Sequence, residues 1–139
     1  MTPRTSQGLR LGLAAAGLLI SGYLVAVHYG HVPLACADQG IVDCTGVLTS
    51  PQSSWFGVPV AVFGIAWFLV AGILALRARA AGAGPEVRTA NMAWLLVGAA
   101  TVVYLVYLEL VVIGRICMWC SFVHIIVLAS LFLAILAEG

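Results

Sequence analysis

Residues 116–137 read ICMWCSFVHIIVLASLFLAILA, and this stretch gives the clearest indication of the fold. It contains no Asp, Glu, Lys or Arg, and it is long enough to cross the hydrocarbon core of a bilayer, which takes about 20 apolar residues. Water is absent from that core, so every backbone N–H and C=O must be bonded within the segment, as in an α-helix. The stretch therefore predicts a membrane-spanning helix, and Cys117 and Cys120 place two thiols at one end of it.

The rest of the chain has the same character. Of its 139 residues, 63% are hydrophobic and only 8% are charged, a composition outside the usual range of soluble domains. Apolar runs predict four spans, at about residues 9–29, 57–76, 91–113 and 116–137. We therefore expect an all-α fold, a single-domain integral membrane four-helix bundle with one sizeable loop at about residues 30–56.

The arginines predict the orientation of this bundle. Positive charge close to membrane segments is kept on the cytoplasmic side. Of the six basic residues, Arg115 stands alone on one side and five lie before the first span or between the second and third: Arg4, Arg10, Arg77, Arg79 and Arg88. Both termini should then be cytoplasmic, and loop 30–56, which has no Lys or Arg, should face outward. A cleaved signal peptide is disfavoured, because the first apolar run is longer than a typical signal core.

This topology gathers all four cysteines on one side of the membrane. Cys36 and Cys44 lie in the outward loop, and Cys117 and Cys120 lie in the first turn of the last span, at its outward end. Disulfides persist outside the cytoplasm and are rare within it. An even number of thiols confined to that compartment favours thiol–disulfide chemistry.

The two pairs differ in ways that suggest a relay. Residues three apart on a helix share a face at a separation that a disulfide can bridge, and a helix N-terminus stabilises a thiolate, so Cys117 should be reactive. Cys36 and Cys44 are separated by ADQGIVD, a polar segment that could move as its bond opens and closes. An external dithiol would reduce the loop pair, and the loop pair would reduce the helix pair. From the edge of the hydrocarbon, a quinone is the natural two-electron acceptor.

Two other readings of the cysteines remain open. Four cysteines could form two structural disulfides that staple the outer loop to the bundle, in a protein without enzymatic activity. They could also bind zinc or copper, alone or with a histidine, because thiolates and imidazoles are good ligands for these metals. Haem attachment would need His directly after the second cysteine of the helix pair, where Ser121 stands instead.

Three polar positions near the cysteines could serve the same chemistry. His124 shares a helical stripe with the helix pair, and it either contacts a ligand or forms a hydrogen bond to a neighbouring helix. Glu109, in the outer half of the third span, either relays protons or reaches the membrane interface. Ser50 followed by Pro51 resembles a helix N-cap with Pro at the first helical position, so a short helix is expected to cover the outer mouth of the bundle.

In their order, these features resemble those of the bacterial homologues of vitamin K epoxide reductase. The resemblance covers most of the chain. It rests on the loop pair, on CTGVLTSPQSSWFGVP at residues 44–59, on a following span without cysteines, and on YLELVVIGRICMWC at residues 107–120. Another bacterial quinone-linked disulfide generator has the two kinds of cysteine pair in the reverse order, which makes that family a poor fit.

The resemblance implies a four-helix bundle around a quinone of the ubiquinone, menaquinone or phylloquinone type, with a capping helix over it. It implies that Cys120 lies nearest the quinone and that Cys117 exchanges with Cys44. It further implies that Cys36 pairs with Cys44 and meets the outside partner, and that Ser50 and His124 lie at the quinone pocket. The membrane would be the inner or cell membrane of a bacterium.

Two departures from the family pattern matter. Some members place an Asn in the second span to bind the quinone carbonyl, and residues 57–76 contain none. Many bacterial members also carry a thioredoxin-like domain after the last span, whereas this sequence ends at Gly139. We therefore expect no fused thioredoxin-like domain, and a separate extracytoplasmic thioredoxin-fold protein as the electron donor.

Overall fold

Four long helices dominate the computed structural model, which describes residues 2–36, 38–80 and 82–138. They are α1 (Pro3–His28), α3 (Val60–Arg79), α4 (Pro85–Tyr107) and α5 (Met118–Glu138), and a π-helical turn, η2 (Leu108–Ile113), prolongs α4. All four helices are long and apolar enough to cross a membrane. The predicted all-α membrane four-helix bundle is confirmed.

The helices α1 and α4 begin earlier than hydropathy predicted, because their first turns are polar. Thr2 caps α1 by accepting a hydrogen bond from the backbone N–H of Thr5, and Pro3 occupies the first helical position. Gly84 is the N-cap residue of α4, which has no side-chain cap, and Pro85 occupies its first helical position. Proline fits such a position because the missing N–H would have no partner within the helix.

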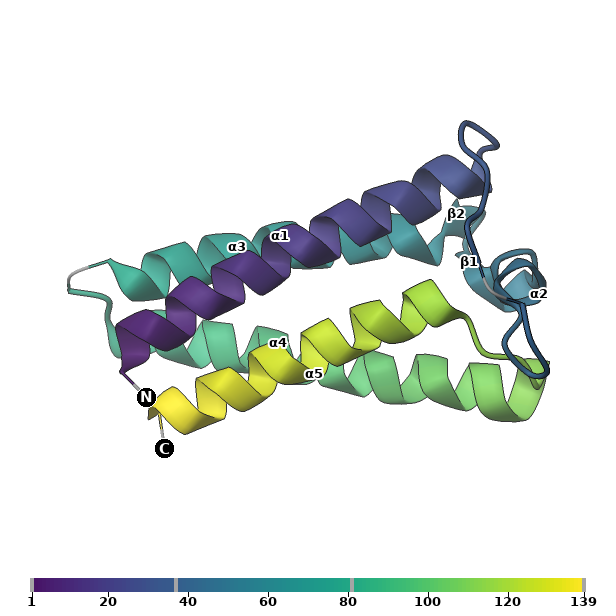
Figure 1. Cartoon of the computed structure of the whole chain (residues 1–139). Coiled ribbons are helices and arrows are strands. Elements are labelled where there is room, and N and C mark those ends of the chain that lie inside the picture. The colour runs from purple at the N-terminus through teal and green to yellow at the C-terminus, as the bar shows by residue number, and fades with distance from the viewer. Residues whose placement is uncertain (1, 37, 81, 139) are drawn as a thin grey trace.

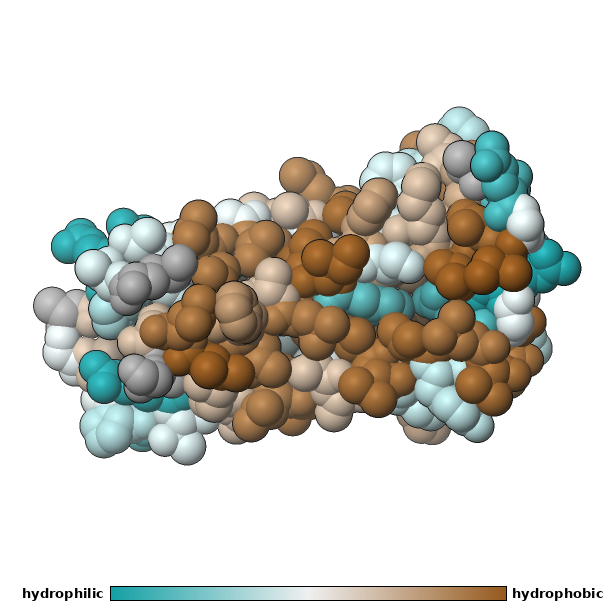
Figure 2. All heavy atoms as spheres, turned by 60° about the horizontal axis from the view of Figure 1, so that its bottom comes forward, coloured by the Kyte–Doolittle hydropathy of each residue, from teal (hydrophilic) through white to brown (hydrophobic). Residues whose placement is uncertain are grey.

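In the bundle, α1 packs against α3 and α5, and α4 packs against the same two helices. Both termini lie at one end of the bundle together with the turn from α3 to α4, and the segment from α1 to α3 covers the other end (Figure 1). On the face shown in Figure 2, hydrophobic atoms form a broad band across the middle, which a narrow row of hydrophilic atoms enters from the right-hand end, and the other hydrophilic atoms gather towards both ends. This distribution suits a chain that crosses a bilayer.

Two glycines let aromatic rings enter the bundle. A Cβ atom at Gly17 of α1 would overlap the ring of Phe68, and one at Gly98 of α4 would overlap the indole of Trp67. Phe68 is 1% exposed and forms part of a core cluster that joins α1, α3, α4 and α5. Small residues allow membrane helices to approach closely, and here they also make room for these rings.

The segment between α1 and α3 forms a cap built from several short elements: α2 (Cys44–Leu48), a 3-10 turn η1 (Pro51–Ser53), and a hairpin of β1 (Ser54–Trp55) with β2 (Val58–Pro59). The capping helix predicted to begin at Ser50 is only the three-residue turn η1. The longer helix, α2, begins at Cys44, because the side chain of Asp43 accepts a hydrogen bond from Gly46 N–H and caps it. The cap is thus less helical than expected.

Candidate functional site

The four cysteines meet where the cap contacts the start of α5. Cys44 and Cys117 are each 0% exposed and pack in one cluster with Val47, and Cys36 and Cys120 pack against that cluster. The sequence prediction that the two pairs lie together is therefore matched by the fold. The cluster thus brings residues of both pairs together, and contact between a thiolate and a disulfide is what exchange requires.

Backbone hydrogen bonds hold the loop against the residues that precede α5. The N–H of Asp43 donates to the carbonyl oxygen of Ile116 at 2.9 Å, and the N–H of Ile116 donates to the carbonyl oxygen of Ile41 at 2.8 Å. Asp43 and Ile116 each stand one residue before a buried cysteine, Cys44 and Cys117. These bonds therefore set the register between the loop pair and the helix pair.

Two side chains reinforce this junction. The indole Nε1 of Trp119 donates to the carbonyl oxygen of Ala35 at 2.6 Å, and the guanidinium of Arg115 donates to that of Gly40 at 3.3 Å. The ring of Trp119 also lies 5.2 Å from the ring of Tyr23, whose hydroxyl accepts from Ala35 N–H. Trp119 thus links α5 to the loop and to the end of α1.

The two pairs are in different redox states. Cys36 and Cys44 form a disulfide, with Cα atoms 6.3 Å apart, and Cys117 and Cys120 are free thiols. The helix α5 begins at Met118, so Cys117 precedes the first turn instead of lying in it. Its sulfur accepts a hydrogen bond from Cys120 N–H at 3.2 Å, which is the bonding pattern of an N-cap residue.

This position favours the thiolate of Cys117. A hydrogen bond from the Cys120 side chain is the largest influence, and together with the backbone N–H groups of Cys120 and Trp119 it holds the pKa of Cys117 below its ordinary value. Burial and the negative charge of Glu109 act in the opposite direction. Hydrogen bonds to the charged form thus outweigh desolvation here.

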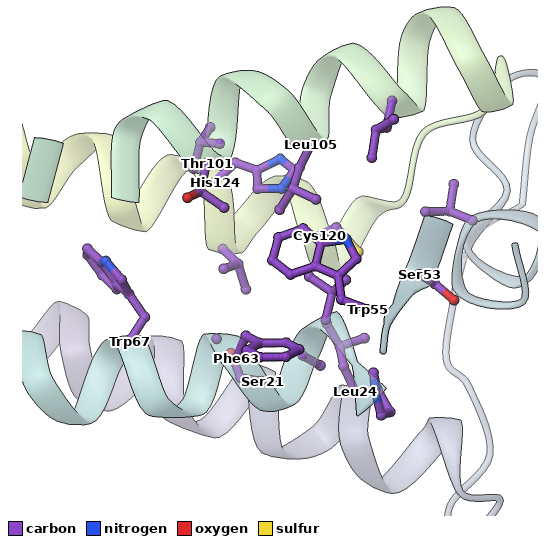
Figure 3. A pocket seen from close by; sticks show the side chains of 18 of the residues that line it. Ser21, Leu24, Ser53, Trp55, Phe63, Trp67, Thr101, Leu105, Cys120 and His124 are labelled. Atoms are coloured by element: carbon purple, nitrogen blue, oxygen red, sulfur yellow. The ribbon is translucent and has the colours of Figure 1, made fainter. Parts of the chain in front are cut away.

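A cavity of about 350 Å³ lies between the cap and the four helices, within the range of small-molecule sites, roughly 300–1,000 Å³. Cys120, His124 and Val127 line it from α5, Trp55 from the cap and Phe63 from α3. In Figure 3 His124, Thr101 and Leu105 lie on one side of the cavity, and Phe63, Ser21 and Leu24 lie on the other. Cys120 therefore connects the sulfur cluster to this largely apolar space.

The polar groups around the cavity differ in what they can donate. The Ser50 hydroxyl lines the cavity but donates to the carbonyl oxygen of Val47 at 2.6 Å, and the Thr101 hydroxyl donates to that of Val97 at 2.9 Å. Both can accept a hydrogen bond from a ligand more readily than donate one. His124 is 7% exposed and lines the same wall as Cys120, four residues away on α5.

Glu109 lies between the cavity and the sulfur cluster. It is 6% exposed, at the start of η2, and its carboxylate accepts a hydrogen bond from Cys117 N–H at 3.3 Å. It also lines the cavity. Its low exposure places the side chain inside the bundle, on the π-helical turn that prolongs α4. The side chain thus points into the bundle.

The family of the chain is given by comparison with known proteins. Residues 9–135 match the model of the vitamin K epoxide reductase family, which is nearly the whole chain. The chain belongs to the vitamin K epoxide reductase family. Membership in this family implies a membrane thiol–disulfide oxidoreductase, in agreement with the four apolar helices and the two cysteine pairs.

Three possible metal ligands lie close together in the cap, as the alternative prediction of a metal site requires. The ligand atoms of Cys36, Asp38 and Cys44 lie within 4.8 Å of one another. However, the two sulfurs are bonded to each other, and a disulfide offers no thiolate to a metal. The disulfide thus argues against metal binding by this pair.

Sequence reasoning missed the inner wall of the cavity. Trp67 and Trp94 both line it, with ring centroids 6.4 Å apart, and each indole N–H donates to the other residue's carbonyl oxygen. Trp67 lies in the middle of its span, where a tryptophan gains nothing from the membrane interface. That central position, with Gly98 available on the next helix, was the signal that could have identified the pair.

Proposed function

We propose that this family member oxidises a thioredoxin-fold protein outside the cytoplasm and passes the two electrons to a membrane quinone, and so supports disulfide formation. The observation that carries the proposal is the burial of Cys44 and Cys117 in one cluster, from which Cys120 reaches the cavity. This arrangement supports exchange that runs from the loop to an apolar pocket. The cysteines are Cys36, Cys44, Cys117 and Cys120.

The exposure of the cysteines suggests the order of steps. Cys44 is fully buried and Cys36 is half-buried, so a partner thiolate would attack Cys36 and release Cys44 as a thiolate. Cys44 would then attack Cys117 of an oxidised helix pair and release Cys120. Once the partner's second thiol has freed Cys36, Cys36 attacks Cys44 and restores the loop disulfide.

The products of these steps correspond to the redox states of the structure. The loop pair is again a disulfide, the helix pair is a dithiol, and the partner leaves with a new disulfide. Two electrons have moved from the partner to Cys117 and Cys120. They then leave the helix pair through Cys120, the sulfur that lines the cavity.

The lining of the cavity supports a quinone as the acceptor, of the ubiquinone, menaquinone or phylloquinone type. The ring centroids of Trp55 and Phe63 are 5.4 Å apart, and the two rings provide flat apolar surface. The imidazole of His124 could donate a hydrogen bond to a quinone carbonyl oxygen. Ser50 would position the cap, because its hydroxyl proton is already used within the cap. A bound quinone supplies an acceptor for two electrons and two protons.

The proposed orientation places the cap outside the cytoplasm and both termini inside, as in a bacterial inner membrane. It is supported by Arg4, Arg77, Arg79 and Arg88 at the end opposite the cysteines. An impermeant thiol reagent added to intact cells should label a cysteine introduced at Ile41, which is exposed in the cap, and not one introduced at Gly82. The reverse labelling would contradict this orientation.

The activity is tested with purified protein, a reduced thioredoxin-fold protein and a soluble quinone. The wild type should form quinol as the partner becomes oxidised, and Cys117→Ala or Cys120→Ala should abolish quinol formation. Ser130→Ala is the matched control, because Ser130 lies on the same helix and its hydroxyl donates only to Ile126 of that helix. Turnover retained in both cysteine variants would rule out the mechanism.

A further inference from the structure

We propose that Glu109 carries the proton of Cys117 between the sulfur cluster and the cavity. The proposal rests on the proposed function, because it concerns the step in which the helix pair gives up its electrons. Oxidation of the dithiol forms one S–S bond at the expense of two S–H bonds, so two protons leave with the two electrons, and the proton of Cys117 leaves when its thiolate forms. A membrane quinone takes up both pairs when it is reduced to the quinol.

The two protons start from different places. Cys120 lines the cavity, so its proton has direct access to a bound acceptor. Cys117 is 0% exposed and packs against Cys44 on the cap side of the cluster. The Cys117 sulfur does not itself line the cavity, and Cys120, whose side chain is hydrogen-bonded to it, must release a proton of its own. The proton of Cys117 therefore needs a second group that borders both the cluster and the cavity.

Glu109 meets both requirements for this group. Its carboxylate lies against Cys117, within hydrogen-bonding distance of the backbone N–H, and the same side chain lines the cavity that Cys120 and His124 line. Among the described residues no other Asp or Glu borders this cavity. The other titratable groups of the cavity wall are His124 and Cys120 on α5 and His28 at the end of α1.

The position of this carboxylate is otherwise costly. An acidic side chain within a membrane span is expensive, and such residues tend to have a function. Holding Cys117 N–H would need only an acceptor, which an amide provides equally well. A group that can take up and release a proton is required only if a proton passes through this point, as oxidation of Cys117 demands.

The first test needs no quinone. Infrared difference spectra are recorded between the reduced and the chemically oxidised helix pair, with the carbonyl band of a protonated carboxyl group as the readout. We expect this band to change on oxidation in the wild type, to be lost in Glu109→Gln, and to persist in Glu86→Gln. Glu86 is the matched control because it is exposed in the first turn of α4, at the other end of that helix. A wild type without the band, or Glu109→Gln with it, would overturn the proposal.

The second test separates proton transfer from positioning. In rapid mixing of the reduced helix pair with a soluble quinone, Glu109→Gln and Glu109→Leu should both slow quinol formation by roughly a hundredfold, the usual scale of general acid–base catalysis. A thermal unfolding midpoint close to that of the wild type would show that both variants fold.

Three outcomes of this experiment are decisive. Slow quinol formation in both variants supports the proposal. A Glu109→Gln variant as fast as the wild type, with Glu109→Leu slow, would show that the side chain only holds Cys117 N–H and would overturn it. A wild type that forms no quinol would instead refute the proposed function, while the infrared result on Glu109 would still be readable.

Discussion

The two cysteine pairs have the same chemistry and very different surroundings. The loop pair belongs to a cap of short elements, in which Cys36 is half-buried and α2 has only five residues. The helix pair stands at the start of α5, a helix of 21 residues packed against α1 and α4. The first pair lies near the surface, with Cys36 partly accessible. The second is fixed, with one sulfur at a cavity and the other at the cap.

This difference suggests why a relay needs two pairs. A partner protein cannot reach a sulfur in the bundle, and a membrane acceptor cannot leave the bilayer. Cys44 and Cys117, each 0% exposed, form the contact between these two surroundings. Because both are buried, external thiols should react with neither sulfur directly.

Single cysteine variants of the loop pair should have the largest effect on partner oxidation. In Cys36→Ser, Cys44 has no resolving partner, so we expect a Cys44–Cys117 mixed disulfide to accumulate and partner oxidation to fall roughly a thousandfold or more, as when a nucleophile is removed. Peptide mapping by mass spectrometry under acid quench would detect this link. In Cys44→Ser, the half-buried Cys36 should form far less of a bond to Cys117. Equal trapping in both variants would show that the two loop cysteines are interchangeable.

The sequence predicted more of the helix pair than of the loop pair. Hydropathy located four spans, and the CMWC spacing put Cys117 and Cys120 at the start of the last one. Hydropathy does not fix the rotation of a helix about its axis, so it left open whether Glu109 faces the bundle. It also missed α2, because a five-residue helix depends on its cap at Asp43 and on backbone contacts to Ile116, which are distant in sequence.

A pH series should show how readily Cys117 forms its thiolate. Hydrogen bonds lower the pKa of Cys117, so its thiolate persists at a lower pH than that of an ordinary thiol, with a pKa of about 8.5. Attack by Cys117 on the loop disulfide should therefore slow only below that lowered pKa, then about tenfold per pH unit as the thiolate is protonated. Rapid acid quench and mass spectrometry of the link to Cys44 would measure the rate.

The cause of the lowered pKa can be tested in the same series. The Cys120 side chain is its largest cause, so Cys120→Ala should move the pH midpoint for attack by Cys117 upward. Cys120→Ser, which keeps a hydrogen-bond donor, should move it less. A midpoint that is the same in both variants would mean that the Cys120 side chain does not hold the thiolate.

The smallest expected effect on exchange comes from the junction between the loop pair and the helix pair. Trp119→Phe keeps an aromatic ring beside Tyr23 but removes the indole donor to the Ala35 carbonyl oxygen, a loss of about 1 kcal/mol. Because Ala35 adjoins Cys36, the loop should be held less firmly, and exchange between the pairs should slow a few-fold. Trp94→Phe removes a comparable indole bond, to Trp67, within the bundle. It should lower thermal stability to a similar degree and leave the quinone-free exchange rate unchanged, whereas equal slowing in both variants would attribute the effect to general loosening of the fold.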